Sequence, residues 1–169
     1  MYDKLNGDRG ILNDYDLAHI KGESRPSGTE RTGTMPFMAL DLLTNDAWGG
    51  KLERLYRHDC ESFGWVLLWI CCRYDNGKEI KNAPLGEFIT HDYNQCFEKK
   101  RTIFPRIYKI PPTPSYIQYW DAAIELLTWP FELRSNQEIR RALGELSTDE
   151  VVGKYSAALE SKGFSIALC

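Results

Sequence analysis

Apolar residues along this chain gather into stretches with helical spacing, and the longest of them, residues 63–72, follows a run of polar residues. Nearly every side chain in this stretch is apolar, so no face of such a helix suits a solvated surface. The pattern therefore predicts a buried central helix over about 59–73. Asp59 is the expected N-cap, with Ser62 close behind, and residues 75–77 (Asp-Asn-Gly) predict a turn after the helix.

Four further helical stretches are predicted after this helix, over residues 85–100, 116–127, 136–146 and 149–161. Prolines mark the expected breaks, at Pro105, in the cluster 111–114 and at Pro130.

The N-terminal part of the chain has a different pattern. Residues 11–18 predict a short strand interrupted by acids, and residues 21–33, rich in Gly, Ser, Thr and charge, predict an exposed loop. Residues 35–43 are an apolar run that ends at a turn signal over 44–46. The predicted fold class is mainly α, with at most a short β-hairpin near residues 8–16.

Composition adds limits on function. With 169 residues, 43% of them hydrophobic and 12% aromatic, the chain suits one folded domain with a real core. The formal charge of -3 does not indicate a basic surface that would bind nucleic acid or an anionic membrane. The charged run 98–101 is interpreted as a solvated helix end. The longest apolar run is too short to span a bilayer, and the N-terminal residues lack an apolar signal core. We expect an intracellular protein, cytoplasmic or nuclear.

Cysteine and histidine spacing argues against a structural zinc site. No C-x-x-C pair occurs, and the three histidines are scattered. Cys71 and Cys72 are adjacent inside the predicted central helix and are interpreted as small buried hydrophobes. The full set of cysteines is Cys60, Cys71, Cys72, Cys96 and Cys169.

Three short segments carry sequence motifs, and the order of these motifs along the chain is informative. Residues 11–18 lead an apolar strand into Asp14-Tyr15-Asp16, residues 31–41 read R-T-G-T-M-P-F-M-A-L-D, and residues 58–64 read H-D-C-E-S-F-G. Together they resemble the C-terminal lobe of a protein kinase. The resemblance is strongest to the fungal-type protein kinase family, whose members show R-T-G-T-x-P-F-M-A and then an H-D-x-E-S helix. It spans roughly residues 10–75.

The resemblance implies roles in phosphoryl transfer for two residues. In kinases the strand ends in D-F-G, whose Asp holds Mg²⁺ on the ATP phosphates, and Asp14 matches that ligand. Asp16 stands in place of the glycine of D-F-G, so the backbone freedom that this glycine supplies in kinases is absent at position 16. In the pattern G-T-x-x-[FY]-M-A-P-E the Thr hydroxyl contacts the catalytic Asp, and Thr34 takes that position.

The resemblance also implies structural roles. The acid of A-P-E pairs with a buried arginine in that family, and here Asp41 replaces Glu while Leu40 replaces Pro. Asp59, Ser62 and Gly64 match the D-x-x-S-x-G start of the central helix, where the Asp fixes the catalytic loop. The arginine partner of the acid is expected among Arg134, Arg140 and Arg141.

Several kinase parts have no counterpart in these residues. The Gly-rich loop, the strand lysine and the H-R-D loop with its metal-binding Asn precede D-F-G in kinases, and none is found here. We therefore expect residues 1–169 to form a partial kinase-like domain. Its expected parts are an activation segment over about 14–43, a central helix over about 59–73 and further helices over 85–161.

ATP, Mg²⁺ and protein substrates are implied for the intact family, which phosphorylates Ser and Thr. For the isolated chain we expect no cofactor and no activity, because phosphoryl transfer depends on all of its positioning parts. Two alternatives remain open from the sequence: a non-catalytic binding or scaffold module, and a remnant without function. The sequence predicts neither nucleic acid nor membrane as a partner, and leaves the oligomeric state open.

Overall fold

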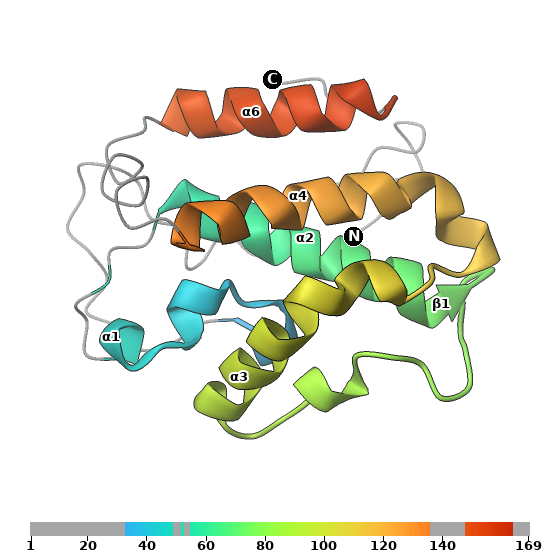
Figure 1. Ribbon diagram of the computed structural model, residues 1–169, viewed down its shortest axis with the longest axis horizontal. Helices are drawn as coiled ribbons and strands as arrows, with labels where there is room; N and C mark the ends of the chain where they lie inside the picture. The colour runs from blue at the N-terminus through green and yellow to red at the C-terminus, as the bar shows by residue number, and fades with distance from the viewer. Residues whose placement is uncertain (1–32, 49–51, 53–54, 136–147, 164–169) are drawn as a thin grey trace, which may run out of the picture. The chain divides into compact units, whose positions relative to one another are not determined.

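The computed structural model describes residues 33–48, 52, 55–135 and 148–163. Its helices are α1 (Asn45–Trp48), α2 (Tyr56–Arg73), α3 (Tyr93–Ile103), α4 (Ile117–Ser135) and α6 (Thr148–Ser161) (Figure 1). Short 3-10 turns occupy Met35–Phe37, Leu40–Leu43, Gly86–Phe88, Phe104–Lys109 and Pro114–Tyr116. The described part is thus mainly helical, as predicted; the predicted hairpin near 8–16 and the predicted helix 136–146 lie outside it.

A small antiparallel hairpin follows α2, where the sequence predicts a turn. Strand β1 (Tyr74–Asp75) pairs with β2 (Lys78–Glu79), and the two residues between them are Asn76 and Gly77. Both have positive φ, 48° and 74°, which is the geometry of a tight two-residue hairpin turn. Asn and Gly are the residues that adopt this backbone most readily, so the local sequence accounts for the turn.

The start of α2 corrects the predicted N-cap. The helix begins at Tyr56, and the capping position is Leu55 rather than Asp59. The Leu55 N–H donates to His58 Nδ1 across 3.1 Å, so the ring nitrogen takes the acceptor role that a Glu or Gln has at the third helical position of a capping box. The prediction that α2 is buried on every side is also wrong, because Phe63 keeps 50% of its surface exposed.

Two other boundaries differ from the sequence pattern. The predicted helix 85–100 begins only at Tyr93, because Asp92 caps it by accepting the Gln95 N–H across 2.8 Å. Leu85 has a left-handed φ of 66°, so the chain bends there, and the residues between Leu85 and Tyr93 do not continue the helix. The predicted break at Pro130 is wrong, because this buried proline lies inside α4, which continues to Ser135 although a proline supplies no N–H to the helix.

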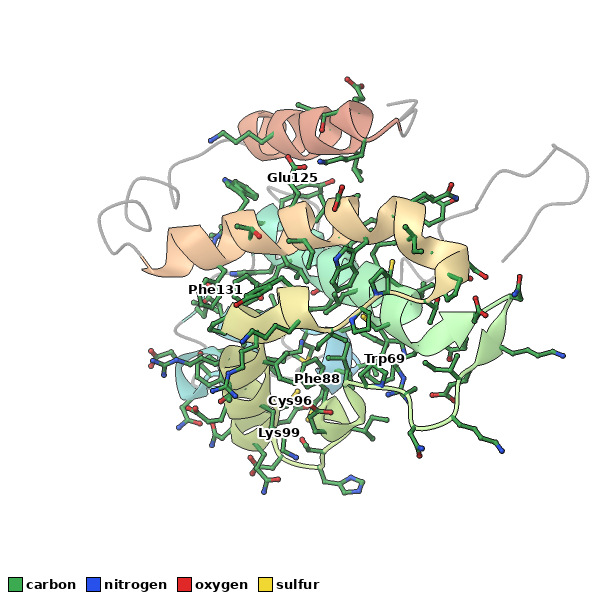
Figure 2. The ribbon with its side chains drawn as sticks, turned by 45° about the vertical axis from the view of Figure 1, so that its right-hand side comes forward. Trp69, Phe88, Cys96, Lys99, Glu125 and Phe131 are labelled. Atoms are coloured by element: carbon green, nitrogen blue, oxygen red, sulfur yellow. The ribbon has the colours of Figure 1, made fainter. Side chains whose placement is uncertain are left out.

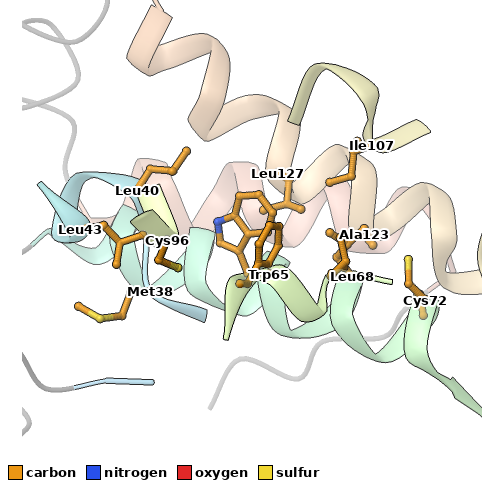
Figure 3. Close-up of a cluster of buried hydrophobic side chains, with 13 residues drawn as sticks. Met38, Leu40, Leu43, Trp65, Leu68, Cys72, Cys96, Ile107, Ala123 and Leu127 are labelled. Atoms are coloured by element: carbon orange, nitrogen blue, oxygen red, sulfur yellow. The ribbon is translucent and has the colours of Figure 1, made fainter. Parts of the chain in front are cut away.

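The core lies where α2 and α4 pack side by side (Figures 1 and 3). Trp65 is its largest buried side chain and meets the ring of Phe88 edge-on, with centroids 5.7 Å apart. Gly64 permits the close approach of the two helices, because a Cβ there would lie 3.0 Å from Leu127 Cδ2. Helix α6 packs on α4, where Lys162 Nζ lies 3.5 Å from Glu125 (Figure 2).

Candidate functional site

Residues 34–43, here called the docked segment, lie against α2 and α3. Two 3-10 turns shape it, and Pro36 sits at the start of the first, where its missing N–H has no helical partner to lose. Met38, Ala39, Leu40 and Leu43 are buried, each with 4% or less of its surface exposed. A segment of this length with four buried side chains is fixed to the helices rather than free to move as a loop.

Asp41 anchors the C-terminal part of the docked segment. Its Oδ2 accepts from Arg57 Nη1 across 2.8 Å, and His58 Nε2 lies 3.5 Å from the same oxygen. Both partners come from the first turn of α2, and the Asp41 side chain is only 6% exposed. A buried carboxylate with a close guanidinium partner holds its backbone in place, since separating the two would leave an uncompensated charge.

Glu61 holds the middle of the docked segment. Its Oε1 accepts the Leu40 N–H across 2.8 Å and the Trp65 Nε1–H across 3.1 Å. Glu61 is 3% exposed, so these are hydrogen bonds of a buried carboxylate. Leu40 stands where the kinase pattern has proline, and only a residue with a backbone N–H can make this contact.

Lys100 reaches the docked segment from α3. Its Nζ donates to the Met38 carbonyl oxygen across 2.7 Å and lies 4.4 Å from the centroid of the Trp65 ring. The residue is fully buried. The interpretation of residues 98–101 as a solvated helix end is therefore wrong for Lys100, whose apolar stem and aromatic neighbours accommodate it in the core.

Two further contacts hold the N-terminal part of the docked segment. The Phe37 ring meets Trp69 of α2 edge-on, with centroids 5.5 Å apart, and the Arg73 guanidinium lies 4.0 Å from the centroid of the same Trp69 ring. Cys96 Sγ lies 3.5 Å from the Met35 carbonyl oxygen, a weak donor contact. The segment is thus held from α2 and α3 along most of its length.

The structure places the sequence-predicted residues as follows. Thr34 is exposed at the N-terminal end of the docked segment, and Asp59 is exposed in the first turn of α2. The Ser62 hydroxyl donates to the His58 carbonyl oxygen, one turn earlier in the helix, across 2.8 Å. Gly64 is buried against α4. Asp14, the predicted Mg²⁺ ligand, lies outside the described residues.

Sequence reasoning did not identify Arg57, Glu61 or Lys100 as partners of the docked segment. The predicted partners of Asp41 lie outside the residues whose side chains are described: Arg134, Arg140 and Arg141. Glu61 was visible only as part of the H-D-x-E-S pattern, and no local signal in the sequence connects Lys100 with Met38, 62 residues earlier.

The cysteines of this region are not reactive groups at neutral pH. Burial raises the pKa of the Cys60 and Cys72 thiols to about 12 and that of the Cys71 thiol to about 11. Burial also raises the pKa of Cys96. These thiols stay protonated, and the thiolate is the nucleophile and metal ligand.

Among the described residues, no three His, Cys, Asp or Glu side chains come together as a metal site. No helix within the same residues is long and apolar enough to cross a membrane.

A family model described as "Fungal protein kinase" matches residues 2–71. This stretch contains the docked segment and α2 as far as Cys71, whereas α3, α4 and α6 lie beyond it. No curated protein matches the chain, and no solved structure matches it.

Proposed function

Since residues 2–71 relate this chain to the fungal protein kinase family, we propose that it supplies the activation-segment end and the central helices of a kinase-like domain. The reaction of such a domain is phosphoryl transfer from ATP to Ser or Thr of a protein substrate. The observation that supports this most is the attachment of the docked segment to α2 through Asp41–Arg57 and Leu40–Glu61. Phosphoryl transfer needs little from the protein beyond positioning and charge neutralisation, and a rigid segment supplies positioning.

We propose roles in this function for Thr34 and Asp59. Thr34 is exposed next to the anchored residues, so its hydroxyl would be available to a catalytic Asp supplied by the missing parts. Asp59 is exposed in the first turn of α2, where a carboxylate suits the backbone N–H groups of a catalytic loop. Asp14 would hold Mg²⁺ on the ATP phosphates once those parts are present.

The 169 residues alone are proposed to be inactive. Their sequence has no counterpart of the Gly-rich loop, the strand lysine or the H-R-D base, and these parts bind the nucleotide and take the hydroxyl proton. The test is incubation of the purified chain and its Asp14→Asn variant with Mg²⁺, radiolabelled ATP and a generic substrate such as casein. Both should give background counts. Transfer by the parent chain that disappears in Asp14→Asn would contradict the proposed inactivity.

A second experiment tests the kinase function itself. The native transcript is mapped at its 5′ end, and the longest in-frame product is expressed beside residues 1–169. A longer product that carries an H-R-D loop should phosphorylate casein, and Asp14→Asn in that product should abolish the activity. A product with those motifs that stays inactive, or a transcript whose coding sequence starts at Met1, would contradict an enzymatic role.

One observation favours a non-catalytic binding module as the alternative. Tyr56 and Phe63 are 45% and 50% exposed and lie seven positions apart on α2, hence on one side of the helix. Exposed aromatic residues on one face are common at protein interfaces. A cellular phenotype that survives Asp14→Asn but is lost in Phe63→Ser would support this alternative.

A further inference from the structure

We propose that Lys100 and Glu61 are positioning residues, which grip the docked segment from two helices and thereby fix where Thr34 stands. The importance of these two residues for phosphoryl transfer rests on the proposed function, whereas their grip on the docked segment, meaning the hydrogen bonds by which they hold it, does not. Neither the kinase motifs nor the family match accounts for Lys100, which lies beyond residue 71.

The two side chains hold the same short piece of backbone by complementary groups. Lys100 donates to the Met38 carbonyl oxygen across 2.7 Å, and Glu61 accepts the Leu40 N–H across 2.8 Å. One contact comes from α3 and the other from α2. Two buried, charge-assisted hydrogen bonds on one carbonyl and one N–H, two residues apart, restrict both translation and rotation of that backbone.

Trp65 joins the two positioning residues. Its indole N–H donates to Glu61 Oε1 across 3.1 Å, while the ammonium of Lys100 lies 4.4 Å from the ring centroid. The face of an aromatic ring is electron-rich and the N–H edge is electron-poor, so a cation on the face and a carboxylate at the edge both match the indole. Displacement of either charge therefore alters the surroundings of Trp65 and, through the other charge, the docked segment.

The position of Thr34 follows from this grip. Its carbonyl oxygen accepts the Phe37 N–H across 2.8 Å in the first 3-10 turn, and Met38 closes that turn through the Met35 carbonyl across 3.2 Å. The turn joins Thr34 rigidly to Met38, whose carbonyl Lys100 holds. Release of Met38 should therefore loosen the whole turn and its exposed threonine.

Hydrogen exchange of the full 169-residue chain, read by mass spectrometry of peptic peptides, tests the proposal. Lys100→Met keeps the unbranched apolar stem, one atom shorter, and removes the donor; Lys99→Met, at the half-buried neighbour, is the matched control. A peptide covering 34–43 should exchange about tenfold faster in Lys100→Met than in the parent, the scale expected for one buried charge-assisted hydrogen bond. Peptides of α4 should be unchanged, and Lys99→Met should behave like the parent.

Two outcomes would overturn the proposal. The first is equal exchange of peptide 34–43 in Lys100→Met and Lys99→Met. The second is acceleration of the 34–43 and α4 peptides by the same factor, which means that Lys100 only fills space in the core. Neither outcome bears on whether the longer product is a kinase, which the Asp14→Asn comparison decides.

A second readout keeps the proposal testable if Lys100→Met does not fold. In a ¹⁵N-tryptophan spectrum, the indole signal of Trp65, assigned with Trp65→Phe, should shift in Glu61→Gln, which keeps the acceptor oxygen and the size of the side chain. It should stay in place in Glu98→Gln, at an exposed residue of α3. An unmoved Trp65 signal in Glu61→Gln, together with unchanged exchange of 34–43, would also contradict the proposed grip.

Discussion

The Leu40 N–H donates to Glu61 Oε1 across 2.8 Å, at the position where the related A-P-E pattern has a proline without any N–H. The backbone before it is compatible with either residue, because Ala39 has φ -57° and ψ 147°, the extended conformation that also precedes proline. The Ala39 backbone would therefore also suit a proline at position 40, whereas the hydrogen bond to Glu61 requires a residue with an N–H. A buried carboxylate on α2 and a non-proline residue at 40 form a matched pair.

Leu40→Pro tests this pairing. Removal of the N–H leaves the buried Glu61 carboxylate without one donor, which should lower the free energy of unfolding by about 2 kcal/mol. The smaller proline ring adds a further loss, because the Leu40 side chain is buried in the core. In a Glu61→Gln background the same change should cost less, because a neutral amide oxygen needs the donor less. Urea unfolding of the two single variants and the double variant gives the coupling energy. Additive effects, within about 0.5 kcal/mol, would show that Leu40 and Glu61 do not act together.

Asp41→Asn tests the anchor at the end of the docked segment. The change leaves the Arg57 guanidinium, whose side chain is 13% exposed, without its close carboxylate, and we expect a loss of about 2–4 kcal/mol. Glu79→Gln is the matched control, because Glu79 also pairs with an arginine, Arg73, but has a side chain that is 50% exposed. That change should cost less than about 1 kcal/mol. Equal losses in thermal or urea unfolding would mean that the Asp41 pair behaves as a surface pair.

The helices were predictable where spacing of apolar residues decides them. The central helix, the helix after residue 116 and the last helix near 149–161 all appear close to their predicted places. Their ends were less predictable, because capping depends on individual contacts. The N-cap of α2 is Leu55 rather than Asp59, and the His58 ring accepts the Leu55 N–H. Buried Pro130 stays within α4 because the surrounding packing outweighs one lost helical hydrogen bond.

The candidate site was predictable only in part. The sequence pattern pointed to the segment with Asp41 and to the start of α2, whose close packing the structure shows. It did not point to Arg57 or Lys100, since their contacts join residues 16 and 62 positions apart. A lysine inside a charged run looks solvated in sequence, and only the packing of α3 shows that Lys100 enters the core.

Gly64→Ala tests the close contact between α2 and α4. Alanine is favoured over glycine inside a helix by about 1 kcal/mol, but overpacking a core costs about 1–3 kcal/mol. The new Cβ would lie 3.0 Å from Leu127 Cδ2, and Leu127 is itself buried, so we expect a net loss of about 1 kcal/mol.

A Leu127→Ala background supplies the control for this change. With the leucine side chain removed, the steric conflict disappears and Gly64→Ala should become neutral or stabilising through its helix propensity. Thermal unfolding of the four proteins measures both effects. The same loss from Gly64→Ala in the two backgrounds would mean that Leu127 is not the group that the new methyl meets.

The buried thiols predict a loss of stability in alkali. In the folded chain the pKa values of Cys60 and Cys72 are raised to about 12 and that of Cys71 to about 11, whereas an unfolded thiol titrates near about 8.5. Between these values the unfolded chain binds fewer protons than the folded chain. The stabilisation is therefore complete below about pH 8.5 and decreases as the pH rises toward 11, by up to about 1.4 kcal/mol per pH unit for each thiol.

Urea unfolding at pH 8, 9 and 10 under reducing conditions measures this dependence, and Cys72→Ala isolates one thiol. The variant should be less stable than the parent at pH 8, because a buried side chain has become smaller, but it should lose less stability between pH 9 and 10, by about 1 kcal/mol. The comparison cancels the titration of tyrosines and lysines, which both proteins share. Parallel pH dependences for the parent and Cys72→Ala would show that this thiol ionises as readily in the folded chain as in the unfolded one.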